Sequence, residues 1–319
     1  MSRYQRQMQM AEIGSVGQEK LGNARVVIVG AGGLGHPILS YLAGAGVGEL
    51  HIVDPDEIEF SNLHRQPLFG EGDIGQSKAE VAAQKIRKNN KDIEVIARPV
   101  RLDPANVQLI CEHADVVVDA ADSFAVTYVL SDFCRDQNIA LISASVLGFE
   151  GYVGGFCGGV APSIRAVFPQ LPMAAQSCAS AGVSGAAVGV MGSLQAQMVI
   201  NVLLDLKPSP LGQMLRCDFK TFQFSRFSFL RAPEPLDGFT FISPTQISPK
   251  DRVIELRTNQ EAPFPVVPHA KQMVAGDIEN LAIEDERIVI VCRTGLRAWN
   301  AGLALQQKGG DNIVLVATG

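Results

Sequence analysis

The chain of 319 residues is long enough for one large domain and a smaller one, because domains usually span about 100–200 residues. Its formal net charge of −6 argues against nucleic acid as the main partner, since phosphate binding requires a basic face. The six cysteines form no CxxC pair, so the sequence predicts neither a disulfide framework nor a four-cysteine zinc site.

The N-terminus carries charged residues with no apolar run behind them. We therefore expect no secretory signal and predict a cytoplasmic protein. The segment 3–7 contains Arg3 and Arg6 but no pattern that favours an ordered element, so on its pattern alone it is a solvated tail.

A run of β-branched residues at 26–29 leads directly into the glycine-rich sequence Gly30-Ala31-Gly32-Gly33-Leu34-Gly35. This pattern is typical of a buried strand followed by a turn that presents backbone N–H groups to a phosphate. Gly30 permits the turn, Gly32 allows close approach of the phosphates, and Gly35 lets the next helix pack closely. Asp54 ends the next apolar strand, where an acceptor for a ribose hydroxyl is expected. Together these features predict a nucleotide site.

Two cations follow the predicted ribose acceptor. The sequence from Ser77 to Glu80 predicts a helix that begins with a capping box, which places Lys78 at the helix N-terminus. A cation is disfavoured there unless an anion is close. Lys78 and Arg65 therefore favour a bound triphosphate over a nicotinamide cofactor, although either side chain alone reads as a surface residue.

Further strands are predicted at 93–100 and 116–118, with a helix at 104–111 between them. This alternation indicates an α/β protein with a doubly wound, mostly parallel, Rossmann-like sheet. Asp122 follows the strand at 116–118, and ligands lie beyond the carboxyl ends of such strands, so Asp122 is a candidate Mg²⁺ ligand. An acidic helix cap is the alternative. The apolar segment 183–206 predicts a buried helix rather than a membrane span.

The composition changes near the end of the chain. Four prolines between 233 and 249 predict a linker over residues 232–249, between a domain at 1–231 and a smaller α/β domain at 250–319. The predicted strand at 287–291 leads into Cys292, in a loop that opens a helix. Aligned N–H groups together with Arg293 and Arg297 would lower the pKa of this thiol, so Cys292 is predicted to be reactive.

The ordered set of motifs in residues 1–230 closely resembles the ThiF/MoeB/HesA family of ubiquitin-activating-like adenylyltransferases. The motifs are Arg3–Gln7, Gly30–Gly35, Asp54–Asp56, Ser61–Gln66, Gly75–Lys78, Asp122 and Gly192–Ala196. The resemblance implies that ATP and Mg²⁺ are used to adenylate the C-terminal glycine of a small ubiquitin-like sulfur-carrier protein ending in Gly-Gly. It also implies a homodimer.

The resemblance further implies the roles of individual residues. The residues that would hold the nucleotide are Gly30, Gly32, Gly33, Gly35, Asp54, Asp56, Asn62, Arg65, Gln66 and Lys78. Among them, Asp54 would hold the ribose, and Asn62, Arg65, Gln66 and Lys78 would hold the phosphates. Asp122 would hold Mg²⁺. Arg6 would reach across the dimer to the ATP of the partner subunit. Cys178 would bond covalently to the carrier, the alternative being a buried free cysteine.

The chain departs from the family pattern in specific places. The usual Thr-Asp-Asn is Ala121-Asp122-Ser123, and Thr127 stands where an arginine is usual. The two zinc-binding CxxC pairs are replaced by the sequences at 163–166 and 232–235. We therefore expect no zinc site and a second half held together by packing alone.

The loop 292–297 resembles the active-site loop of a rhodanese domain. This implies that a persulfide on Cys292, loaded by a persulfide sulfur donor, attacks the acyl-adenylate and yields the carrier thiocarboxylate. Three alternatives stay open. They are an enzyme of the same fold that modifies a peptide or an RNA-linked amino acid, an NAD-binding oxidoreductase, and a non-catalytic scaffold that binds the carrier.

Overall fold

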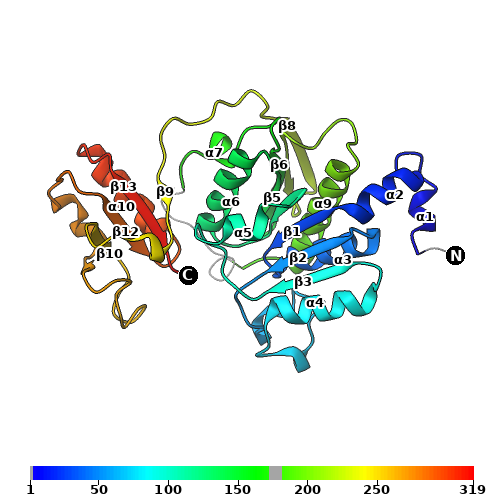
Figure 1. Cartoon of the computed structure of the whole chain (residues 1–319), viewed down its shortest axis with the longest axis horizontal. Helices are drawn as coiled ribbons and strands as arrows, with labels where there is room; N and C mark the ends of the chain where they lie inside the picture. Colours follow the sequence, from blue (N-terminus) through cyan, green and yellow to red (C-terminus); the bar gives the residue numbers. More distant parts are fainter. Residues whose placement is uncertain (1–2, 172–181) are drawn as a thin grey trace.

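A computed structural model describes residues 3–171 and 182–319. Its larger unit is built on an eight-stranded sheet with the strand order β3-β2-β1-β4-β5-β6-β7-β8 (Figure 1). The first five strands are parallel, and they are β1 (Arg25–Val29), β2 (Glu49–Val53), β3 (Glu94–Arg98), β4 (Val116–Asp119) and β5 (Ala140–Leu147). The last three are antiparallel, and they are β6 (Glu150–Cys157), β7 (Gln213–Asp218) and β8 (Gln223–Ser228).

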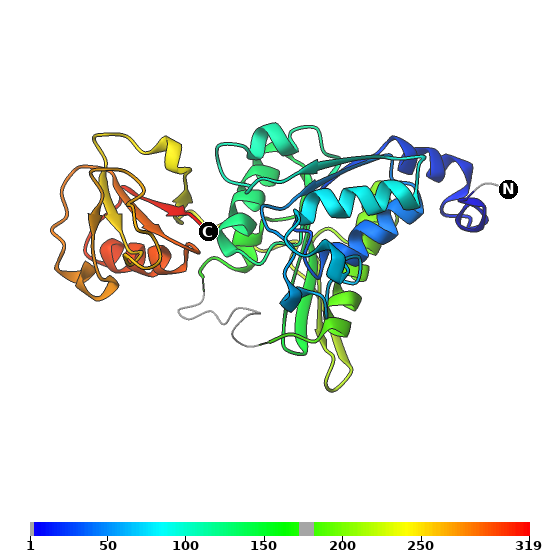
Figure 2. The ribbon, with the colours of Figure 1, turned by 90° about the horizontal axis from the view of Figure 1, so that it is seen from below.

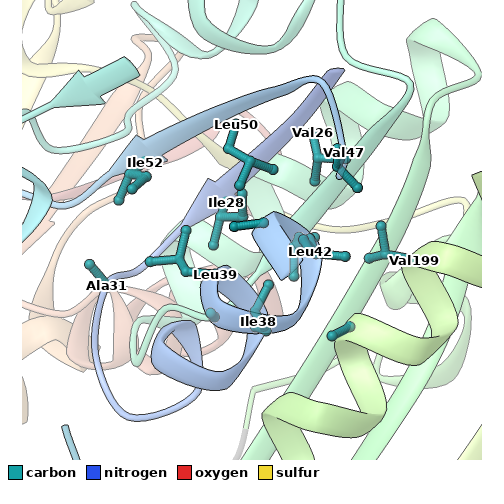
Figure 3. Packing of buried hydrophobic residues seen from close by; sticks show 14 of the residues in the cluster. Val26, Ile28, Ala31, Ile38, Leu39, Leu42, Val47, Leu50, Ile52 and Val199 are labelled. Atoms are coloured by element: carbon teal, nitrogen blue, oxygen red, sulfur yellow. The ribbon is translucent and has the colours of Figure 1, made fainter. Parts of the chain in front are cut away.

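Helices cover both faces of this sheet. One face is covered by α3 (Gly35–Ala45), α4 (Lys78–Asn89) and α9 (Gly185–Leu203), and the other by α5 (Val107–Cys111) and α6 (Phe124–Gln137). In β1 the side chains of Val26 and Ile28 pack on the face covered by α3, α4 and α9, whereas Val27 and Val29 pack on the face covered by α5 and α6. Successive strand residues point to opposite faces of a sheet. Figure 3 shows Ile28 packed with Leu39 and Leu42 of α3. The predicted doubly wound α/β fold is confirmed.

Helix α9 is long and apolar enough to cross a membrane by length and composition. In the structure it packs on α3, β5 and β6, and it buries Met191, Gln195 and Val199. It therefore forms part of the core, as the sequence predicts.

The described part of the larger unit contains further helices. They are α1 (Gln5–Met8), α2 (Gly14–Asn23), α7 (Ile164–Val167), η1 (Phe60–Asn62) and η2 (Glu71–Asp73). Helix α1 belongs to the N-terminal arm, which is a solvated tail on its sequence pattern alone. The arm is ordered: the Tyr4 hydroxyl accepts from Asn90 Nδ2 at 2.9 Å, and Gln7 Nε2 donates to the Ala45 carbonyl at 2.8 Å.

The smaller unit contains a five-stranded, wholly parallel sheet with the order β11-β10-β12-β13-β9. Its elements are β9 (Thr240–Phe241), η3 (Pro244–Gln246), β10 (Arg252–Glu255), β11 (Lys271–Gln272), η4 (Ala275–Asn280), β12 (Ile288–Cys292), α10 (Leu296–Gln307) and β13 (Ile313–Ala317). Strand β9 lies inside the predicted linker 232–249 and pairs with β13. The linker is therefore shorter than predicted, and the smaller unit begins before residue 250.

Candidate functional site

The glycine-rich turn after β1 has a geometry that only glycine allows at two positions. Gly30 has φ +109°, and a Cβ there would lie 2.4 Å from the Ala120 carbonyl oxygen. A Cβ on Gly35 would lie 2.2 Å from the Gly30 carbonyl oxygen, so the start of α3 packs directly on the turn. A Cβ on Gly32 would meet only Gln66 Nε2, at 3.7 Å. The turn is thus closely packed at both ends and open at Gly32, as a phosphate-binding turn requires.

Asp54 ties the turn to the end of β2. Its Oδ2 accepts from the backbone N–H of Ala31 at 2.7 Å, and its Oδ1 accepts from that of Asp56 at 2.9 Å. Burial raises the pKa of Asp54, while these two N–H groups and Lys78 act against the rise. Each carboxylate oxygen can accept a further hydrogen bond, so the group retains acceptor capacity for a ribose hydroxyl.

Lys78 begins α4 and is only 7% exposed. Ser77 is the N-cap, and its side chain accepts from the Glu80 N–H at 3.4 Å. The anion expected near this lysine is present within the chain, because Lys78 Nζ donates to Asp56 Oδ2 at 3.0 Å. Asp56 also donates its backbone N–H to Asp54, so the ammonium lies close to the carboxylate that holds the glycine turn.

The loop containing η1 supplies the other predicted phosphate ligands. Asn62 and Gln66 are buried, and in the described part of the chain Asn62 Oδ1 and Gln66 Oε1 have no hydrogen-bond partner. Arg65 Nη1 donates to the Ser61 carbonyl at 3.2 Å, and Arg65 Cγ lies beside Gly33. Buried polar atoms rarely stay unpaired, so these two acceptor oxygens fit a ligand that brings hydrogen-bond donors, such as the ribose hydroxyls of a nucleotide. Phosphate oxygens would pair with the NH₂ groups of the same amides.

The carboxyl end of β4 carries two acidic residues with different environments. Asp122 is exposed in the loop before α6. Asp119 is buried, and burial raises its pKa to about 6, although Ser143 Oγ and Thr127 Oγ1 each donate to it at 2.8 Å. Sequence reasoning missed Asp119; the available signal was an acidic residue at the end of an apolar strand, eight residues before Thr127.

Arg6 is not brought to this site within its own chain. It lies in the arm that contacts Ala45, at the C-terminal end of α3, whereas the glycine turn lies at the N-terminal end. An eleven-residue helix spans about 16 Å at 1.5 Å per residue, so the arm and the turn lie at opposite ends of α3.

Cys292 ends β12, and its Sγ accepts from the backbone N–H groups of Gly295 at 3.1 Å and Ala298 at 3.3 Å. The residue is 0% exposed. Arg297 Nη1 contacts Glu261 Oε2 at 3.0 Å, so a carboxylate offsets part of its charge. The loop supplies the expected N–H donors, but the sulfur is enclosed rather than open to solvent. Cys178, the other predicted functional thiol, lies outside the described residues.

The two segments that stand in place of the zinc-binding pairs are joined by hydrogen bonds. Glu234 accepts from both the backbone N–H and the Oγ of Ser163, each at 2.6 Å. Arg165 donates to Asp132 at 2.6 Å and to the Phe239 carbonyl at 3.0 Å. The expectation that packing alone holds the second half together was therefore wrong.

Comparison with known proteins gives consistent results. The model of the ThiF family matches residues 4–237. The sulfur carrier protein adenylyltransferase of Thermus thermophilus is 40% identical over 240 residues, which is 73% of this chain and 89% of that protein. The adenylyltransferase and sulfurtransferase MOCS3 of Sus scrofa is 42% identical over 231 residues, which is 72% of this chain and 51% of that protein.

Among solved structures, E. coli MccB with ATP superposes with a TM-score of 0.63 and 26% identity, covering 73% of this chain and 72% of that one. The family match ends at residue 237, before β9. It therefore covers the larger unit and leaves the smaller unit to be interpreted from its own geometry.

Proposed function

This chain belongs to the ThiF family, and we propose that it uses ATP to adenylate the C-terminal glycine of a small ubiquitin-like sulfur-carrier protein, then converts that glycine into a thiocarboxylate. One observation supports the nucleotide site above all others. The Gln66 amide lies beside Gly32 of the glycine turn, and Arg65 lies beside Gly33. Among the described residues, the buried amide oxygens of Asn62 and Gln66 have no hydrogen-bond partner.

Adenylation makes an unreactive carboxylate into an electrophile, because AMP is a good leaving group. In this proposal the carrier carboxylate attacks the α-phosphorus of ATP and pyrophosphate departs. Lys78 and Arg65 offset the negative charge that develops on the leaving phosphates. Asp54 accepts a ribose hydroxyl, and Asp56 keeps the Lys78 ammonium in place until the nucleotide arrives.

The residues at the carboxyl end of β4 offer the oxygen ligands that Mg²⁺ prefers. Asp122 offers an exposed carboxylate there, and Mg²⁺ is commonly held by one or two carboxylates together with substrate phosphates and water. When bound, Mg²⁺ would supply positive charge to the phosphates. Asp119 is already engaged by Ser143 and Thr127, and we assign it the positioning of this loop rather than metal binding.

We assign sulfur transfer to Cys292. A donor persulfide passes its outer sulfur to the Cys292 thiolate and leaves as a thiol. The outer sulfur of the Cys292 persulfide then bonds to the carrier carbonyl carbon while the bond to AMP breaks. A second thiolate, from Cys178 or a small thiol, attacks the inner sulfur, forms a disulfide with Cys292 and releases the thiocarboxylate.

Two further parts of the proposal concern assembly. We propose that the chain is a homodimer in which Arg6 serves the ATP of the partner subunit. The supporting observation is that Arg6 lies at the far end of α3 from the glycine turn of its own chain. We also propose a cytoplasmic location.

The test is exchange of radiolabelled pyrophosphate into ATP, with and without carriers ending in Gly-Gly, followed by the intact mass of the carrier. The proposal predicts exchange that requires the carrier, and an adenylate adduct on the carrier. Carrier binding without exchange would indicate a scaffold. Bound NAD with no exchange would indicate an oxidoreductase.

A further inference from the structure

The two units of the chain share a closely packed aromatic contact. Trp299 of α10 is 1% exposed and stacks on Tyr128 of α6, with ring centroids 5.5 Å apart and an interplanar angle of 16°. The Arg165 guanidinium lies 4.4 Å from the Tyr128 ring centroid and 5.9 Å from that of Trp299. Figures 1 and 2 both show α6 on the side of the sheet that faces the smaller unit.

Polar contacts fix the same orientation. Arg165 links α6 to the smaller unit, because it donates both to Asp132 and to the carbonyl of Phe239, whose ring packs edge-on against Trp299. Ser243 Oγ, at the start of η3, donates to Asp103 Oδ2 of the larger unit at 2.9 Å. The contacts around Trp299 and Arg165, together with the hydrogen bond between Ser243 and Asp103, thus hold the two units in one orientation.

This arrangement places the cysteine loop against the first turn of α6. Gly295 donates its N–H to Cys292 Sγ, and a Cβ on Gly295 would lie 3.3 Å from the Cβ of Ala125. Ala125 follows Asp122 by three residues. The loop that encloses the sulfur therefore adjoins the first turn of α6, and the loop just before this turn carries the proposed Mg²⁺ ligand of the same chain.

We propose that Cys292 delivers sulfur to the acyl-adenylate formed on its own chain, and not to the one formed on the partner subunit. The inference rests on the proposed function and specifies the route within it. The covalent step is unchanged: the outer persulfide sulfur bonds to the carrier carbonyl carbon, AMP leaves, and a thiolate then releases the thiocarboxylate. The contact between the two units determines which active site the Cys292 persulfide can reach.

Two heterodimers, purified with different affinity tags on the two subunits, distinguish the routes. The first pairs a Lys78→Ala subunit with a Cys292→Ser subunit. The second pairs a subunit carrying both changes with an unchanged subunit. Each contains one intact Lys78 and one intact Cys292, but only the second has both in one chain. Pyrophosphate exchange reports adenylation, and the intact mass of the carrier reports the thiocarboxylate.

Both heterodimers should retain half of the wild-type exchange, because each has one complete adenylation site. The second should retain half of the wild-type thiocarboxylate yield, whereas the first should fall at least about tenfold below it. Equal yields from the two heterodimers would overturn the inference. A wild-type protein that exchanges pyrophosphate but makes no thiocarboxylate would instead overturn the proposed sulfur transfer, and the inference with it.

A single substitution tests the contact between the cysteine loop and α6 without a heterodimer. Ala125→Arg places a large side chain where the cysteine loop meets α6, and Gln137→Arg places the same side chain at the exposed end of the same helix. Ala125→Arg should lower the ratio of thiocarboxylate yield to exchange rate at least about tenfold, while Gln137→Arg should leave it unchanged. An unchanged ratio in a folded Ala125→Arg protein would show that sulfur transfer does not depend on this contact.

Discussion

The pair formed by Lys78 and Asp56 shows how single residues prepare the site. A lysine at the start of a helix opposes the helix dipole, and a buried ammonium requires a partner. Asp56 supplies that partner at 3.0 Å, and it is much more exposed than Lys78. Phosphate oxygens can therefore take the place of a solvated carboxylate without moving the lysine.

Lys78→Ala should reduce carrier-dependent pyrophosphate exchange by about two orders of magnitude, the usual scale for loss of one charge partner in a transition state. Lys88→Ala is the matched control, since Lys88 lies exposed on the same helix. The control should keep the wild-type rate. Equal rates in the two variants would remove Lys78 from the mechanism.

Asp119 should make stability depend on pH in a recognisable direction. Burial raises its pKa from 3.8 to about 6, so the folded state holds the proton more tightly than the unfolded state. The stabilisation that protonated Asp119 gives the folded state is fully present below the pKa that Asp119 has in the unfolded chain. It is lost as the pH rises through the pKa that Asp119 has in the folded state. From about pH 4 to about pH 6 the wild-type protein should lose about 2 kcal/mol of unfolding free energy relative to Asp119→Asn.

Urea unfolding of both proteins at each end of that range measures the effect. The comparison between the two proteins cancels the contributions of all other titrating groups. A difference that does not change with pH would show that Asp119 has an ordinary pKa in the folded state.

At the scale of elements, the sequence predicted those that follow a simple period. The valine-rich strands, the glycine turn and the buried helix at 183–206 were predictable because each is a local sequence pattern. Strand β9 was missed because only Thr240 and Phe241 form it, in a proline-rich segment. Its pairing depends on β13, a long-range contact that no local pattern reports.

The candidate site likewise has features that local motifs predict and contacts that they do not. Asp54, Lys78 and the glycine turn lie beside one another as the motifs predict. The enclosure of Cys292 depends on residues 295–298 folding back over the sulfur, and the position of the arm depends on Ala45 and Asn90. These contacts join separate elements, so periodicity and spacing could not reveal them.

The bond between Glu234 and Ser163 is a testable contact between two elements. Glu234→Ala would leave the buried N–H of Ser163 without its acceptor, at a cost of about 1–2 kcal/mol in unfolding free energy. Glu19→Ala, at an exposed position on α2, is the control and should cost little. Urea unfolding checks both, and equal stability of the two variants would show that the contact adds nothing.

At the scale of the whole molecule, the arm with Arg6 and the unit with Cys292 lie at opposite ends of the long axis (Figure 1). The proposed adenylation site lies between them, at the carboxyl ends of β1, β2 and β4. The arm carries Arg6, which we propose serves the ATP of a second subunit, whereas Trp299 in the smaller unit packs against α6 of its own chain.

Arg6→Ala and Lys78→Ala subunits should complement each other if Arg6 acts on the partner's ATP. Each variant alone should be inactive in pyrophosphate exchange, whereas tagged heterodimers contain one site with both residues intact and should recover activity. A protein that is monomeric in solution, or purified heterodimers that recover no exchange, would show that Arg6 does not act on the ATP of a partner subunit.

The central claim is that the chain adenylates a carrier in one unit and supplies sulfur from the other. Thiocarboxylate yield from Cys292→Ser, with a persulfide donor, a thiol and ATP, tests it most directly, because a serine hydroxyl cannot hold sulfane sulfur. We predict near-normal pyrophosphate exchange and no thiocarboxylate. A wild-type yield of thiocarboxylate from Cys292→Ser would contradict the account, since the sulfur would then come from elsewhere.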